Sequence, residues 1–209
     1  MRTYSIKTDI AADKEPIINF IEATLLGSNV AISREQLETI VSFYEPKTFK
    51  KSDLFVTEGK VSNGSFFMTD GFMRAFTHDL NGQEVTTQFY SKNHSVFEAA
   101  SFFIRTKAME NIQAITPCEG FMLSFERMNK LFHSVPQFRE FGRTMLVKEF
   151  LAFKQRALSL INKTAEERYE ELIGANKEIF QYAQLKYIAS YLGITDSSLS
   201  RIRKEFSKK

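Results

Sequence analysis

The spacing of apolar residues changes along the chain, and it begins with a helical period. Ile17 and Ile21 belong to a run with intervals of three and four residues that follows Pro16, a residue suited to the first turn of a helix. The sequence Ser33-Arg-Glu-Gln36 matches a capping box and is followed by a second apolar stripe. We therefore expect two helices before the chain changes character.

Between about residues 48 and 125 the pattern becomes one of short apolar runs, rich in Phe and β-branched residues. Asp70-Gly71 and Asn81-Gly82 separate some of these runs. Because type I′ turns require positive φ at two successive residues, such pairs are strong hairpin signals. Many short strands at this spacing indicate a compact barrel or roll. The expected strands cover residues 66–68, 72–76, 85–89, 112–114 and 121–125.

From residue 136 to residue 162 a single helical stripe predicts a rod of roughly 40 Å. A stripe of this length has two explanations, which are packing across its own domain and a two-stranded coiled coil. Charged neighbours such as Lys148 and Glu149 favour the coiled coil, and with it a homodimer. The dimer interface would then contain Phe138, Phe141, Met145, Leu146, Phe150, Phe153, Ala157 and Leu160.

After residue 162 a second capping box, Thr164-Ala-Glu-Glu167, begins a new helix. We place a domain boundary there. The chain would consist of an N-terminal unit over residues 1–135, the long helix over 136–162 and a small helical unit over 163–209.

The last unit has the spacing of a helix-turn-helix. A small residue, Ala189, stands where the two helices would touch, and Gly193 follows four residues later, where the turn needs positive φ. Leu199 and Ile202 supply the inner face of the second helix, and Thr195 stands at its N-cap position.

The outward face of that second helix is polar and basic. Residues near the start of a recognition helix point to base edges in the major groove, and Arg201 can bond bidentately to guanine. Asp196 can accept from a cytosine amine or simply favour the helix N-terminus. Lys186, Arg203, Lys204, Lys208 and Lys209 suit phosphate contacts. The candidate DNA-binding residues are Lys186, Thr195, Asp196, Ser197, Ser198, Ser200, Arg201, Arg203 and Lys204.

Composition narrows the classes of protein. The net charge of the 209 residues is only +3, but residues 182–209 hold six basic and two acidic side chains, as a nucleic-acid surface would. The single cysteine, Cys118, excludes an intrachain disulfide and an all-cysteine metal cluster. The opening residues lack the apolar stretch of a secretory signal, and no run approaches the length of a membrane span, so we expect a cytoplasmic protein without membrane contact.

Catalysis is not expected. The chain has no Gly-rich phosphate loop, no Gly-x-Ser-x-Gly elbow and no His-Glu-x-x-His motif. We predict neither catalytic nor metal-binding residues, and no cofactor.

The order of a turn-rich roll, a long helix and a C-terminal helix-turn-helix resembles the Crp/Fnr family of transcription regulators. The stretch Tyr187-Ile-Ala-Ser-Tyr-Leu-Gly-Ile-Thr with Leu199-Ser-Arg-Ile-Arg203 is similar to the branch of that family common in Bacteroidetes, and Glu166-Glu-Arg-Tyr169 matches the start of its DNA-binding domain. The resemblance implies an α+β fold: a cyclic-nucleotide-binding-like jelly roll with flanking helices, a dimerisation helix and a helix-turn-helix domain. It also implies a homodimer on a palindromic operator in double-stranded DNA, with Arg201 reading guanine and RNA polymerase as a further candidate partner.

The chain departs from the cyclic-AMP-binding members of the family. Their phosphate-binding cassette has Gly-Glu and then Arg-Ser, whereas Phe97-Glu98-Ala99 and Ala108-Met109 stand here. Phe153-Lys154 replaces the hydroxyls that would touch the base. Without the arginine no planar fork holds a cyclic phosphate, so we predict a degenerate effector pocket that does not bind cyclic AMP. Lys107 or Lys154 as a substitute cation is the alternative.

Two further expectations follow from the resemblance. The chain ends soon after the recognition helix, so the wing hairpin of the family is expected to be missing. The roll would sense an unknown small molecule or nothing. The competing interpretation is an effector-binding or protein-interaction module whose helix-turn-helix no longer reads DNA.

Overall fold

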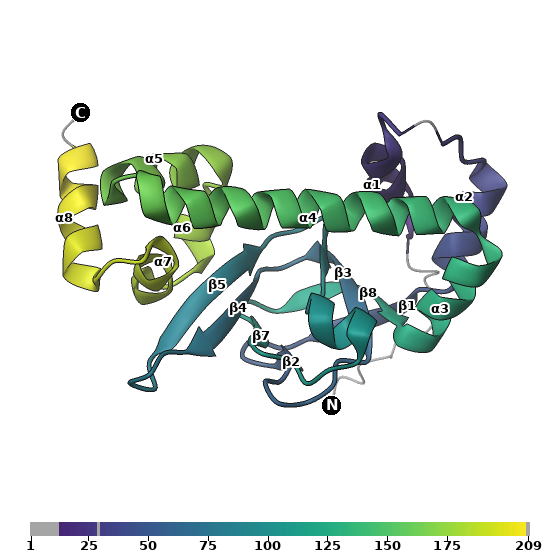
Figure 1. Cartoon of the computed structure of the whole chain (residues 1–209), viewed down its shortest axis with the longest axis horizontal. Coiled ribbons are helices and arrows are strands. Elements are labelled where there is room, and N and C mark those ends of the chain that lie inside the picture. Colours follow the sequence, from purple (N-terminus) through teal and green to yellow (C-terminus); the bar gives the residue numbers. More distant parts are fainter. Residues whose placement is uncertain (1–12, 29, 208–209) are drawn as a thin grey trace, which may run out of the picture.

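The computed structural model describes residues 13–28 and 30–207, so the opening residues, Lys208 and Lys209 lie outside the described part (Figure 1). The chain begins with α1 (Glu15–Leu25) and α2 (Arg34–Ser42). The capping box of α2 is confirmed, because Gln36 N donates to Ser33 Oγ while Gln36 Oε1 accepts from Ser33 N.

Two four-stranded antiparallel sheets follow and form the expected jelly roll. The first sheet has the order β1-β8-β3-β6, and the second has the order β2-β7-β4-β5. In chain order the strands are β1 (Glu45–Phe49), β2 (Leu54–Val56), β3 (Gly64–Asp70), β4 (Met73–His78), β5 (Glu84–Tyr90), β6 (His94–Val96), β7 (Asn111–Ala114) and β8 (Cys118–Ser124).

One of the two turn signals was misread as a hairpin. Asn81-Gly82 does close the β4–β5 hairpin, with Gly82 at φ 76°. Asp70-Gly71 instead carries the chain from β3 in one sheet to β4 in the other, since β3 pairs with β6 and β8. Gly71 has φ 106°, and a Cβ there would lie 2.6 Å from Cys118 Sγ, so the crossover requires glycine.

The roll separates two cores. Residues 64–68 of β3 are buried throughout, because the side chains of this strand alternate between two apolar layers. Phe66 packs between the sheets with Met73 and Ile112. Phe67 points to the other side and packs in a cluster with residues of α1 and α2, such as Ile21 and Ile40.

The same helical layer contains η1 (Ala100–Ile104), a π-helical segment, and α3 (Phe125–Ser134). Phe125 was expected to end a strand, but it is the first residue of α3. Ser124 caps that helix by accepting from Arg127 N, which explains why the strand stops one residue earlier.

The long helix α4 (Pro136–Asn162) has the bounds that the sequence predicts. It runs across the roll and continues to the C-terminal helices (Figure 1). Its role as one continuous dimer seam needs correction: the side chains of Phe138 and Phe141 are 2% and 4% exposed because they pack in the chain's own core, and Met145 lies against it. From Leu146 onward the apolar side chains are largely exposed.

Four helices complete the chain: α5 (Ala165–Ala175), α6 (Ile179–Tyr182), α7 (Leu185–Leu192) and α8 (Asp196–Phe206). The capping box at Thr164 and Glu167 is confirmed in both directions. A third core joins Tyr169 to Ile188 and Leu199 inside this unit, and it extends to Phe72 of the roll. None of the helices in the described ranges is long and apolar enough to span a membrane.

Candidate functional site

The α7–α8 unit has the geometry of a helix-turn-helix. Ala189 and Leu199 are 1% and 0% exposed where the two helices pack. Gly193 ends α7 in the left-handed region at φ 66°, and Ile194 N donates to Ala189 O. Thr195 begins α8 as its N-cap, accepting from Ser198 N at 3.3 Å. The turn is therefore fixed by one glycine and one hydroxyl.

The outer face of α8 is open and basic. Arg201, Arg203 and Lys204 are exposed, and their side chains have no hydrogen-bond or ion-pair partner among the described residues. Ser198 is half-buried. The other exposed candidates are Lys186, Thr195, Asp196, Ser197 and Ser200. Unpaired guanidinium and ammonium groups on a protruding helix are available to an external anion.

The residues of the predicted effector pocket differ widely in burial. Phe97 is buried in the helical core, and Ala108 is buried between the sheets. Met109 is 70% exposed and Phe153 is 68% exposed. Ala99 and Lys154 are exposed as well.

Glu98 is the only charged residue of the predicted pocket that is buried, with a side chain that is 6% exposed, and its carboxylate forms a hydrogen bond within the roll. Glu98 Oε2 accepts from Ser101 N at 2.6 Å, and this bond tightens the start of η1. Arg105, the nearest arginine in sequence, donates to Ser62 O and to Asn63 Oδ1, so its guanidinium is engaged away from Glu98.

Three carboxylates, those of Glu98, Glu110 and Glu149, lie near the buried Tyr90, and of these only Glu98 was predicted as a pocket residue. Burial raises the pKa of Tyr90 well above its ordinary value, and the charges of Glu110, Glu149 and Glu98 raise it further. Burial also raises the pKa of Glu110, and the charge of Glu98 adds to this, while a hydrogen bond from Thr87 and the charge of Arg156 act in the opposite direction. The position of Glu110, directly after the replaced Ala108-Met109, was the available signal.

The match of residues 46–134 to the cyclic nucleotide-binding domain family agrees with the roll. The transcriptional activator protein anr of Pseudomonas aeruginosa is 24% identical over 189 residues, which are 83% of this chain and 74% of that protein.

Two solved structures share the fold. One is the c-di-GMP-responsive global regulator CLP of Xanthomonas campestris, with a TM-score of 0.66 and 15% identity over 84% of this chain and 92% of that one. The other, from Eubacterium rectale, is assigned to the Crp/Fnr family of transcriptional regulators and has a TM-score of 0.67 and 14% identity over 88% and 86% of the two chains.

By their names, these similar proteins are a transcriptional activator and transcription regulators. The branch within the family stays a prediction. The chain therefore contains a cyclic nucleotide-binding domain over residues 46–134, and along most of its length it is similar to a transcriptional activator and to a solved structure assigned to the Crp/Fnr family.

Proposed function

We propose that the chain is a sequence-specific DNA-binding transcription regulator that acts as a homodimer on a palindromic operator without control by cyclic AMP. The observation that carries the proposal is α8, whose exposed Arg201, Arg203 and Lys204 are unpaired in the described part of the chain. Arg201 would read guanine, while Arg203, Lys204 and Lys186 would hold phosphates. The side chains of Ser197 and Ser200 would lie at the same base edges.

The second half of α4 supports the dimer. Phe150, Phe153 and Ile161 are 62%, 68% and 81% exposed, and a helix with so much uncovered apolar surface needs a partner. Leu146, Phe150, Phe153, Ala157 and Leu160 keep the alternating four- and three-residue spacing of a coiled-coil seam. We therefore restrict the proposed interface to residues 146–161.

Cyclic-AMP independence rests on charge. A cyclic phosphate needs a cation where the chain has Ala108, and the carboxylates of Glu98, Glu110 and Glu149 act on Tyr90 nearby. Bringing a phosphate toward three carboxylates in a half-buried site is unfavourable. This proposal does not identify a small molecule that the roll binds. RNA polymerase stays a candidate partner.

The proposed units are a sensor domain over 1–135, a dimerisation helix over 136–162 and a DNA-binding domain over 163–209. Residues 1–12, 29, 208 and 209 of these units lie outside the described part.

Selection from a random duplex library tests sequence-specific binding directly. We expect a palindrome whose half-sites lie about one helical turn, roughly 34 Å, apart. The matched control is Arg201→Ala, which should lose preference at one base per half-site. A wild-type protein that enriches no sequence over input would contradict the proposal and favour a protein-interaction role.

Sedimentation of Phe150→Glu tests the dimer. We expect the wild type to sediment as a dimer and the variant as a monomer, because a charge would be placed in the centre of the seam. Leu80→Glu is the control, because this side chain is fully exposed and lies in the turn between β4 and β5, outside α4. A variant that stays dimeric would contradict the assigned interface.

A further inference from the structure

The first helix of the helix-turn-helix packs on the roll of its own chain. Helix α7 lies beside β5, as Figure 1 shows. Thr86 N donates to Ser190 Oγ at 3.1 Å, and Ser190 Oγ donates to Thr86 Oγ1 at 3.2 Å. The rings of Phe89 and Tyr191 extend the contact, with centroids 5.2 Å apart. Backbone, hydroxyl and aromatic groups thus join the two units.

Arg74 of β4 lies at the centre of this contact, and its side chain is only 1% exposed. Its guanidinium carbon lies 4.1 Å from the centre of the Phe76 ring and 3.5 Å from that of Tyr187, one ring from each unit. Arg74 also pairs with Glu84 of β5. The buried guanidinium of Arg74 is therefore in contact with an aromatic ring from the helix-turn-helix, and the two form a cation–π interaction.

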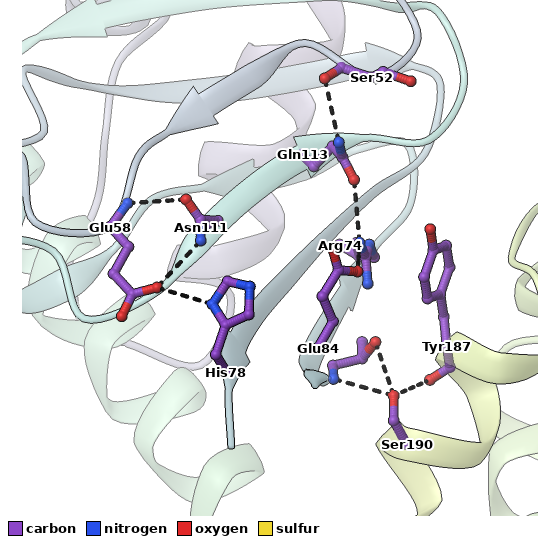
Figure 2. A network of polar contacts seen from close by, with 10 residues as sticks. Ser52, Glu58, Arg74, His78, Glu84, Asn111, Gln113, Tyr187 and Ser190 are labelled. Carbon is purple, nitrogen blue, oxygen red and sulfur yellow. Dashed lines mark hydrogen bonds and ion pairs between the residues drawn. The ribbon is translucent and has the colours of Figure 1, made fainter. Parts of the chain in front are cut away.

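The roll holds this arginine in place from behind. Arg74 Nη2 donates to Gln113 Oε1 at 3.2 Å, and Gln113 Nε2 donates to Ser52 O at 3.2 Å (Figure 2). Nε and Nη1 of Arg74 are buried without a hydrogen-bond partner among the described residues. A buried cation of this kind adds little to the free energy of unfolding. It does restrict how the two units can be arranged, because the cost of burying its charge is offset only when its partners are in place.

The docked arrangement leaves the reading surface free. The roll covers the face of α7 that carries Tyr187, Ser190 and Tyr191, whereas Arg201 and Arg203 of α8 stay exposed. Figure 1 shows α8 at the end of the molecule, beyond α7 and away from the sheets. A unit docked in this way can still approach DNA.

We propose that Arg74 is a positioning residue for DNA reading: through Tyr187 and the Thr86–Ser190 pair it fixes the helix-turn-helix on its own roll and so sets the spacing of the two recognition helices in the dimer. This inference rests on the proposed function. Each reading unit would otherwise swing about the end of α4, near Lys163, and a dimer would accept half-sites at several spacings. Docking removes that freedom before DNA is met.

A reversible crosslink tests the direction of the effect. Thr86→Cys combined with Ser190→Cys places two thiols where the hydroxyls meet, and Cys118 is buried and does not compete. We expect the oxidised protein to bind the selected operator at least as tightly as the reduced one. A loss of about tenfold on oxidation, restored by reductant, would show that the docked state is the inactive one and would overturn the proposal.

Arg74→Met and Tyr187→Leu test the contact from its two sides, with Arg34→Met as control, since Arg34 forms an exposed ion pair on α2. Operators with half-sites moved apart or together by two base pairs are the probes. We expect each variant to lose about tenfold on the optimal operator and little on the shifted ones, so that spacing preference flattens. A variant with the wild-type preference would contradict the role of Arg74.

Hydrogen exchange of the Thr86 amide, measured without DNA, separates this inference from the proposed function. The amide should exchange faster in both variants than in Arg34→Met, because its acceptor is Ser190 Oγ. If exchange rises while the wild type reads no DNA, docking is right and the proposed function is wrong. Unchanged exchange in both variants would overturn the docking role itself.

Discussion

Two regions of this chain are placed where homologous folds could receive a phosphate, and they differ in charge and in freedom. At the mouth of the roll, Glu98, Glu110 and Glu149 act on the buried Tyr90, and Ala108 stands where a cation is needed. On α8, Arg201 and its basic neighbours are exposed and unpaired among the described residues. Under the proposed function, the first region disfavours an anion and the second binds one.

The difference shows that the fold of a domain does not determine which ligand the domain binds. The roll has both sheets, the π-helical segment and the buried Glu98, and under the proposed function it does not bind a cyclic phosphate, because Ala108 stands at the expected position of the arginine. The helix-turn-helix keeps its turn and its basic face together. We therefore assign anion recognition to α8 alone.

Arg201→Ala has the largest expected effect. Affinity for the selected operator should fall by about 1–3 kcal/mol, because the guanidinium is lost at a base edge, while affinity for random DNA should change little. Competition titrations with both duplexes measure the two losses. Equal losses would show that Arg201 contacts phosphate instead of a base.

Thr195→Ala should lower the free energy of unfolding by about 1 kcal/mol, since the Ser198 amide loses its N-cap acceptor. Thermal unfolding without DNA measures the change. Thr195→Ser keeps the hydroxyl and should unfold like the wild type. If Thr195→Ala is as stable as Thr195→Ser, the hydroxyl at the N-cap does not stabilise α8.

Arg203→Ala should weaken specific and random DNA binding alike. The slope of log K against log salt should become shallower by about 0.9, the value for one phosphate contact. Titrations at four salt concentrations give the slope. A slope equal to that of the wild type would exclude a phosphate contact of Arg203.

Glu110→Gln has the smallest effect and concerns the roll. Burial raises the pKa of Glu110, so the folded state favours the protonated form, and the stability from this group is present at acidic pH and lost as the pH rises through the folded pKa. The variant should therefore melt at or above the wild-type temperature at pH 7, with the difference shrinking toward pH 4.

The control for that series is Glu22→Gln, a substitution at an exposed carboxylate of α1. It should give melting temperatures parallel to the wild type across the pH range. A Glu110→Gln variant that also runs parallel would contradict the raised pKa.

Local signals predicted the elements well. Both capping boxes, the bounds of α4 and the turn at Gly193 are confirmed, because each depends on residues within a few positions of one another. The helix-turn-helix was predicted for the same reason: Ala189 and Leu199 are ten residues apart and pack directly.

Long-range packing was not predictable in this way. Phe138 and Phe141 share one stripe with Phe150 and Phe153, yet only the first pair meets α1 and the core, and no periodicity marks that division. Gly71 signals a turn without saying whether the next strand joins the same sheet. The contact of Arg74 with Tyr187 joins residues more than a hundred positions apart.

In the candidate site, the exposed basic face of α8 could be predicted from sequence. Once Leu199 and Ile202 are assigned to the buried side of this short helix, the helical period places the remaining residues on the outer side. The acidic region of the roll could not be predicted, since Tyr90, Glu110 and Glu149 come together only through the fold.

The most direct test of the central claim is a fluorescence-anisotropy titration of the protein with the duplex from upstream of its own gene, in excess random competitor, with and without cyclic AMP. We expect competitor-resistant binding that cyclic AMP leaves unchanged. Binding that appears only with cyclic AMP would contradict the proposed function. The roll would then bind the cyclic phosphate although it has Ala108 at the position of the arginine and the carboxylates of Glu98, Glu110 and Glu149 nearby.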